Sequence, residues 1–165
     1  MNLTNTSKNE TGAAAFVQSE LFARTFREGM TLVEETASYL DSEGRTASKE
    51  LSRDAAMSYA GASMRLTTQL MQIASWLLVL RAVREDEMSL IEAAEPKYRL
   101  EQSSVSGNDY EFAGLPDRLM LLIENTRQLY SRISRLDADI FAAKGQQQGD
   151  VALQQRALME AFGTG

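Results

Sequence analysis

Two pairs of neighbouring carboxylates are the residues of this chain whose type and spacing could support metal chemistry. Glu34 and Glu35 are adjacent, and Asp137 and Asp139 are two residues apart. Helical bundles hold paired iron or manganese ions with such carboxylates, but those centres also use histidine from Glu-x-x-His motifs. The chain contains no histidine. We therefore expect both pairs to lie on solvated helix faces, and we expect no metal or other cofactor.

Catalysis that depends on cysteine or histidine is excluded by the same composition. The chain has neither cysteine nor histidine. Zinc sites built from these residues, Ser-His-Asp triads, thiol nucleophiles and disulfides are therefore impossible. Carboxylates, lysine, serine and tyrosine remain, but no motif gathers them into a pocket. We expect a protein that is not an enzyme.

Length and composition favour one soluble helical domain. The 165 residues are 44% hydrophobic, enough to bury a sizeable core. Residues that favour helices are abundant, and only two prolines interrupt them. The longest apolar run lies between Gln72 and Arg81, whereas a membrane span needs ~20 residues. We expect a cytoplasmic protein that does not associate with membranes.

Hydrophobic periodicity predicts an all-α fold, an antiparallel three-helix bundle of up-down-up order. The bundle is expected at 15–144, between a disordered segment at 1–14 and a flexible tail at 145–165. The apolar residues of the third helix keep 4-3 spacing over three heptads, which favours near-parallel packing. The helices are expected at about 16–42, 48–85 and 116–144, the last opened by Pro116 and closed by Lys144 and Gly145.

The second helix has more apolar surface than one bundle needs. Its main stripe is Leu66, Leu70, Ile73, Leu77 and Leu80, and a neighbouring stripe is Thr67, Met71, Ala74 and Leu78. Methionines such as Met64 and Met71 are expected to fill gaps in the core. A third stripe becomes apolar only at Trp76, Val79 and Val83. We expect these three residues to form a homodimer interface, although an exposed Trp76 could instead anchor another protein.

The connection between the second and third helices is long and acidic. Residues 84–114 contain eight acidic residues against three basic ones, so most of the net charge of −6 lies there. Ser89 and Glu92 have the spacing of a capping box, which predicts a short helix. The basic and aromatic residues Lys97, Tyr98 and Arg99 follow. Either Tyr98 and Leu100 pin this loop to the bundle, or the segment recognises a partner protein.

Two further segments are candidate contacts for partner proteins. Arg127, Tyr130, Arg132 and Arg135 give the third helix a basic side, which is either a solvated face or a docking surface for an acidic partner. Nucleic acid is disfavoured as a ligand by the net negative charge. In the tail, Leu158, Met159 and Phe162 are the candidate contact residues.

The second helix resembles a known family. The stretch MRLTTQLMQIASWLLVLRAV at 64–83, the segment PKYRL at 96–100 and the segment LPDRL at 115–119 are similar to the RcdA family of alphaproteobacterial regulators of CtrA degradation. The resemblance covers roughly residues 18–143. It implies a dimeric three-helix bundle without catalytic residues, and a C-terminal tail that matters for function.

The resemblance also implies a role. Members of the family act as adaptors or accessory factors that promote proteolysis of cell-cycle regulators such as CtrA by the ClpXP protease. The expected partners are thus protease machinery, its regulators and its substrates. The alternative is a signalling or transcriptional regulator that binds other proteins through its bundle surface.

Overall fold

The elements of the protein are all helical in the part of the chain that the structure describes. This computed structural model describes residues 12–100 and 114–162, with the backbone alone for residues 142–162. Residues 12–18 are helical. The elements that follow are α2 (Glu20–Asp41), α3 (Glu43–Lys49), α4 (Arg53–Arg84), α5 (Leu90–Ala93), the 3-10 helix η1 (Pro96–Tyr98) and α6 (Asp117–Phe162).

Serine side chains cap three of these helices at their amino ends. The hydroxyl of Ser19 accepts a hydrogen bond from the amide of Phe22 at 3.2 Å, which satisfies one of the free N–H groups at the start of α2. Ser52 caps α4 in the same way. At α5 the predicted capping box is confirmed, because Ser89 and Glu92 exchange both of its hydrogen bonds.

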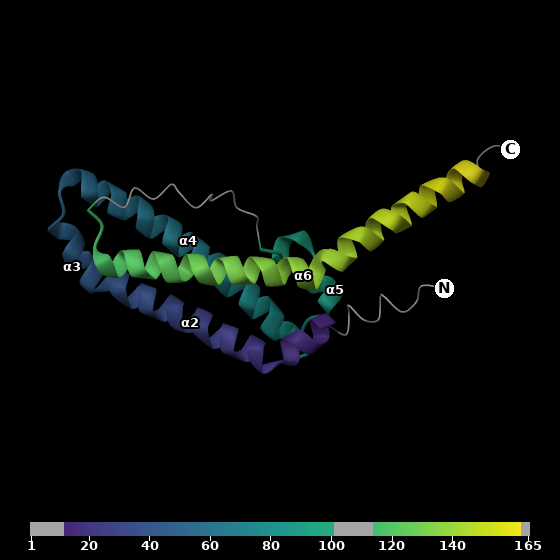
Figure 1. Cartoon of the computed structure of the whole chain (residues 1–165), viewed down its shortest axis with the longest axis horizontal. Helices are drawn as coiled ribbons and strands as arrows, with labels where there is room; N and C mark the ends of the chain where they lie inside the picture. Colours follow the sequence, from purple (N-terminus) through teal and green to yellow (C-terminus); the bar gives the residue numbers. More distant parts are fainter. Residues whose placement is uncertain (1–11, 101–113, 163–165) are drawn as a thin grey trace.

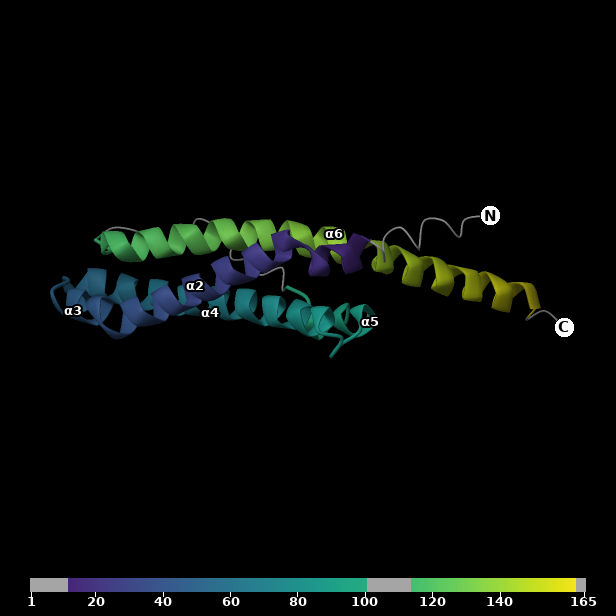
Figure 2. The ribbon, with the colours of Figure 1, turned by 90° about the horizontal axis from the view of Figure 1, so that it is seen from below.

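The three long helices α2, α4 and α6 pack against one another along their lengths (Figures 1 and 2). Contacts between named residues set their directions. Phe26 lies beside Arg81, and Gly29, further along α2, lies beside the earlier residue Leu77, so α2 is antiparallel to α4. By contrast, Ala55 at the start of α4 contacts Gly114, just before α6, whereas Trp76 contacts Asp137. Helices α4 and α6 therefore run in the same direction.

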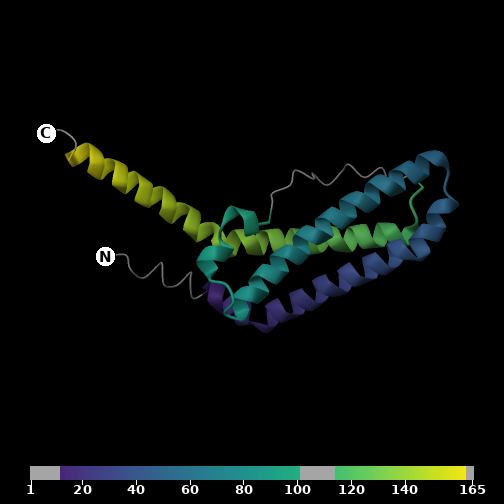
Figure 3. The same cartoon turned by 180° about the vertical axis from the view of Figure 1, so that it is seen from behind.

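The predicted up-down-up order is wrong in this respect. Helix α2 is antiparallel to both of the other long helices, and only the α4–α6 pair departs from an antiparallel bundle (Figure 3). The physical reason is the connection from residue 85 to residue 116. Helix α4 is about 48 Å long at ~1.5 Å per residue, and an extended chain covers that distance in about 15 residues. The connection is thus long enough to return to the starting end of the bundle.

Two predicted boundaries also differ from the structure. The second long helix, expected from about residue 48, begins at Arg53, because residues 43–49 form the separate helix α3, which contains Gly44. A Cβ atom there would lie 2.5 Å from the hydroxyl of Tyr59, so the close packing of α3 explains the glycine. Helix α6 continues to Phe162 rather than ending near residue 144. Each glycine in a helix costs only about 1 kcal/mol, which the helix-favouring residues around it offset.

The core lies between the long helices. Leu66, Ile73 and Leu77 of α4 and Leu129 and Ile133 of α6 are fully buried, which confirms the main stripe predicted for the second helix. Within the described residues, α4 is the single helix long and apolar enough to cross a membrane, with 39% of its apolar window buried in the bundle. Core helices of soluble proteins pass the same test, so this feature is weak evidence for a membrane span.

Candidate functional site

The two carboxylate pairs lie in different surroundings. In residues 12–100 and 114–141 there is no group of three or more acidic side chains placed to hold an ion. Glu34 and Glu35 are exposed on α2, and Glu35 lies 3.8 Å from Arg118. Asp139 is exposed, but Asp137 is buried, so the expectation of a solvated face is wrong for Asp137.

Asp137 is the centre of a polar cluster that joins three elements. Its Oδ1 accepts a hydrogen bond from the indole Nε1 of Trp76 on α4 at 2.9 Å. Arg99, directly after η1, donates from Nε and Nη2 to the same carboxylate at 2.8–3.0 Å. The Arg99 guanidinium also lies 4.6 Å from the ring centre of Phe141. A buried carboxylate with this many donors has its hydrogen-bonding capacity satisfied.

The Asp137 cluster fastens the connection to the bundle. Arg99 reaches α6, and the next residue, Leu100, is only 8% exposed. Tyr98 is half-buried, and the ammonium of Lys97 lies over its ring at 4.8 Å. Of the two interpretations of this segment, attachment to the bundle describes two of its residues: Leu100 is buried, and Arg99 binds Asp137 of α6. Lys97 stays exposed and pairs with Glu95.

Sequence reasoning missed the role of Asp137, although a signal was present. A buried tryptophan usually needs an acceptor for its indole N–H. Asp137 lies four residues after Ile133 and four before Phe141, both buried, so it occupies a core position of α6. An acidic residue at such a position, with one tryptophan in the chain, indicates a buried hydrogen bond.

The predicted dimer interface is already covered within one chain. Trp76 is 2% exposed, Val83 is buried and Val79 packs against the core while partly buried. The connection and α6 cover this face, because η1 packs on α4 and Asp137 binds the indole. The reason for expecting dimerisation at these three residues therefore does not hold.

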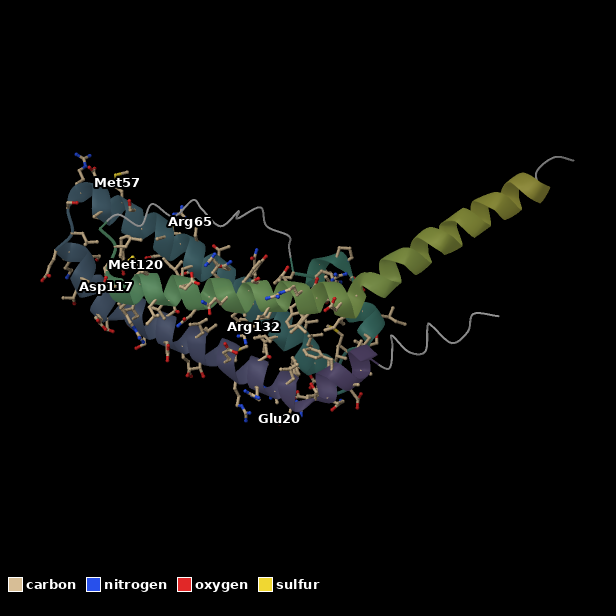
Figure 4. The ribbon with its side chains drawn as sticks, viewed as in Figure 1. Glu20, Met57, Arg65, Asp117, Met120 and Arg132 are labelled. Atoms are coloured by element: carbon tan, nitrogen blue, oxygen red, sulfur yellow. The ribbon has the colours of Figure 1, made fainter. Side chains whose placement is uncertain are left out.

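A different side of α4, the one that carries Met71 and Leu78, is exposed. Met57, Met64, Met71 and Leu78 recur at every seventh residue and are 52–73% exposed. Figure 4 shows Met57 pointing away from the bundle near the start of α4. The expectation that Met64 and Met71 fill the core is wrong, because their side of α4 faces away from both other long helices. Four of the seven large apolar side chains found exposed in the described residues belong to this stripe.

The arginines predicted on the third helix share one side of α6. Arg127, Arg132 and Arg135 line a hollow of about 490 Å³ at the seam between α6 and α2. Tyr130 instead packs against the core while partly buried. The tail candidates Leu158, Met159 and Phe162 lie on the last turns of α6, where the structure describes the backbone alone. That part of α6 projects beyond the bundle in three views (Figures 1–3).

Comparison with known proteins places this arrangement in a family. Residues 13–162 match the family described as protein of unknown function DUF1465. The chain is similar to the crystal structure of RcdA from Caulobacter crescentus CB15, with 50% sequence identity and a TM-score of 0.66. That match covers 78% of this chain and 98% of the RcdA chain. Comparison with curated proteins gave no match. The chain therefore belongs to the DUF1465 family, and the resemblance to RcdA expected from its sequence is confirmed.

Proposed function

We propose that this protein is a non-catalytic adaptor that promotes ClpXP-type proteolysis of cell-cycle regulators such as CtrA in the cytoplasm. The observation that carries the proposal is the 50% identity to RcdA over nearly the whole RcdA chain. An adaptor needs no reactive centre, because tethering raises the local concentration of a substrate at the protease. It needs a rigid body and separate surfaces for its partners.

The architecture supports such a role. The packed helices supply the rigid body. The last part of α6, from Phe141 to Phe162, projects beyond them for about 30 Å at ~1.5 Å per residue. Leu158, Met159 and Phe162 lie at the far end of this extension. Lys97 and Tyr98 form a second candidate contact beside the bundle, in a hollow of about 470 Å³ that they share with Met71.

A reconstituted degradation assay tests the adaptor role. Purified ClpXP, its accessory regulators and fluorescent CtrA are combined with the full chain, or with a chain that ends at Lys144. We expect the full chain to accelerate loss of CtrA, and the shortened chain to fold normally but accelerate it less. Equal CtrA half-lives with and without the full chain would refute the proposal. Equal rates with both chains would refute the role of the tail.

We also propose that the protein is a homodimer joined through the exposed stripe of α4. A repeat of seven residues keeps one side of a helix against a partner helix. Between Asp54 and Arg81 the helix carries a single charge, Arg65, so the stripe is uncharged over most of its length. Ala60, Thr67 and Ala74 lie between the larger residues and are small enough for close approach.

A two-fold axis near Thr67 and Thr68 fits this stripe. Two antiparallel copies of α4 would then place Met64 against Met71 of the partner subunit, and Met57 against Leu78 of the partner subunit. Burying each methionine contributes about 1.5–3 kcal/mol. Such an interface is self-complementary, as a two-fold dimer requires.

Two experiments test this dimer. Because the chain has no cysteine, Thr68→Cys introduces a unique thiol, which should give a disulfide-linked dimer on mild oxidation if it lies near the axis. Ala60→Cys, far from the axis, should not. In light scattering, Met64→Lys should give a monomer, whereas Leu121→Lys, an exposed apolar position on α6, should leave the dimer intact. A monomeric unmodified protein at tens of micromolar would refute the dimer.

A further inference from the structure

The seam between α2 and α6 combines exposed arginines with two adjoining hollows. The first, of about 490 Å³, is lined by Glu28 of α2 and by Arg127, Gln128, Ser131, Arg132 and Arg135 of α6. The second, of about 400 Å³, shares Glu28 and Gln128 with the first and adds Arg27 and Glu35 as its other charged residues. Figure 4 shows Arg132 on the side of α6 that faces α2. The lining is mainly polar, so the seam suits a charged ligand rather than an apolar one.

The arginines of the seam are held only by exposed contacts. Arg132 pairs with Glu28 across the seam, and both side chains are about half exposed. Arg127 pairs with Glu124 one turn earlier on α6. Arg135 donates from Nε to the backbone carbonyl of Ser131 at 3.3 Å. Exposed pairs of this kind contribute little to stability, so a ligand can exchange with them easily.

We infer that this seam binds an acidic segment of a partner protein, and that Glu28 occupies the place of one partner carboxylate in the free protein. Guanidinium groups bind carboxylates in paired, directional hydrogen bonds, and Arg127, Arg132 and Arg135 share one face of α6. Eight residues of helix span about 12 Å. In an extended peptide, alternate side chains on one face cover about 13 Å over four residues. The seam therefore fits an extended segment with an acid at every second position.

The chemistry favours a short acidic peptide over nucleic acid. The net charge of the chain is −6, which repels a long polyanion. Glu28 and Glu124 also lie among the arginines, so the positive charge is local. A short acidic segment meets only this local charge. The surface would serve such a partner whether or not the protein delivers substrates to a protease.

Opposite effects of two charge changes test the inference. The probe is a short fluorescein-labelled peptide in which glutamate and serine alternate, and its binding to the full chain is measured by fluorescence anisotropy. Arg135→Gln removes a binding group and should weaken binding roughly two- to fivefold. Glu28→Gln removes the internal competitor and should tighten binding by a similar factor, about two- to fivefold.

Matched controls separate this effect from net charge. Arg45→Gln and Asp41→Asn make the same charge changes in an exposed pair at the α2–α3 junction, and neither should alter binding. A peptide with glutamine in place of glutamate should not bind. The inference is overturned if the seam variants leave binding unchanged, if the controls act as strongly, or if a labelled single-stranded oligonucleotide binds more tightly than the peptide. Circular dichroism establishes that each variant is folded.

Discussion

Replacing Asp137 with alanine is expected to destabilise the protein by about 2–3 kcal/mol. The carboxylate is the shared acceptor for the indole of Trp76 and the guanidinium of Arg99. Removing one partner of a buried ion pair typically costs about 3–5 kcal/mol. We expect a smaller cost for Asp137→Ala because the Arg99 side chain is 29% exposed and can regain some contact with water. The indole N–H stays buried, so its lost acceptor is part of the cost.

Urea unfolding followed by circular dichroism measures this change. The variant and the unmodified protein are compared at equal concentration, because association would shift the apparent stability. In thermal unfolding the expected loss corresponds to roughly 4–12 °C. Trp76 is the one tryptophan of the chain, so its emission reports separately on the Asp137 cluster. A shift of that emission to longer wavelengths is expected if the connection separates from the bundle.

Four further variants, among them Arg99→Ala alone, locate the source of the effect. Asp137→Asn keeps an oxygen for the indole but loses the charge, and should cost about 1–2 kcal/mol. Asp139→Ala, an exposed neighbour on the same helix, should change stability by less than about 0.5 kcal/mol. Combining Arg99→Ala with Asp137→Ala should cost less than the sum of the two single changes. If the free energy of unfolding of Asp137→Ala lies within about 0.5 kcal/mol of that of the unmodified protein, the Asp137 cluster does not stabilise the fold.

Other predictions concern the core and the cap of α5. Leu129→Ala should lower the unfolding free energy by about 2–5 kcal/mol, because Leu129 is fully buried, and a loss below about 1 kcal/mol would contradict the packing. Gly29→Ala should be destabilising by about 1–3 kcal/mol despite the better helix propensity of alanine, since the new Cβ meets a terminal methyl of Leu77; an increase in urea midpoint would refute this. Hydrogen bonds from the backbone amide and hydroxyl of Ser89 lower the pKa of Glu92. The stability contributed by the capping box should therefore be fully present at pH values above the usual glutamate pKa, and should be lost as the pH falls through the lowered pKa of Glu92. The Ser89 amide resonance should follow that titration by NMR, and should not in Glu92→Gln.

Local sequence was sufficient for the parts of the fold that depend on neighbouring residues. The capping box of Ser89 and Glu92 was predictable because its hydrogen bonds join residues three apart. The buried stripe of α4, from Leu66 to Leu80, was predictable because helical spacing places those residues on one face. The end of α6 was not, because lysine and glycine near residue 145 permit a helix to stop but do not require it.

Contacts between distant residues decided the rest. Periodicity shows which faces of a helix are apolar, but it carries no information about what covers them. The faces of α4 that contain Trp76 and Met71 were therefore equivalent in the sequence, and only the tertiary structure buried the first and exposed the second. The connection between α4 and α6 is long enough for α6 to run either parallel or antiparallel to α4, so its length did not decide the direction. The role of Asp137 required Trp76, 61 residues earlier in the chain, to lie beside it.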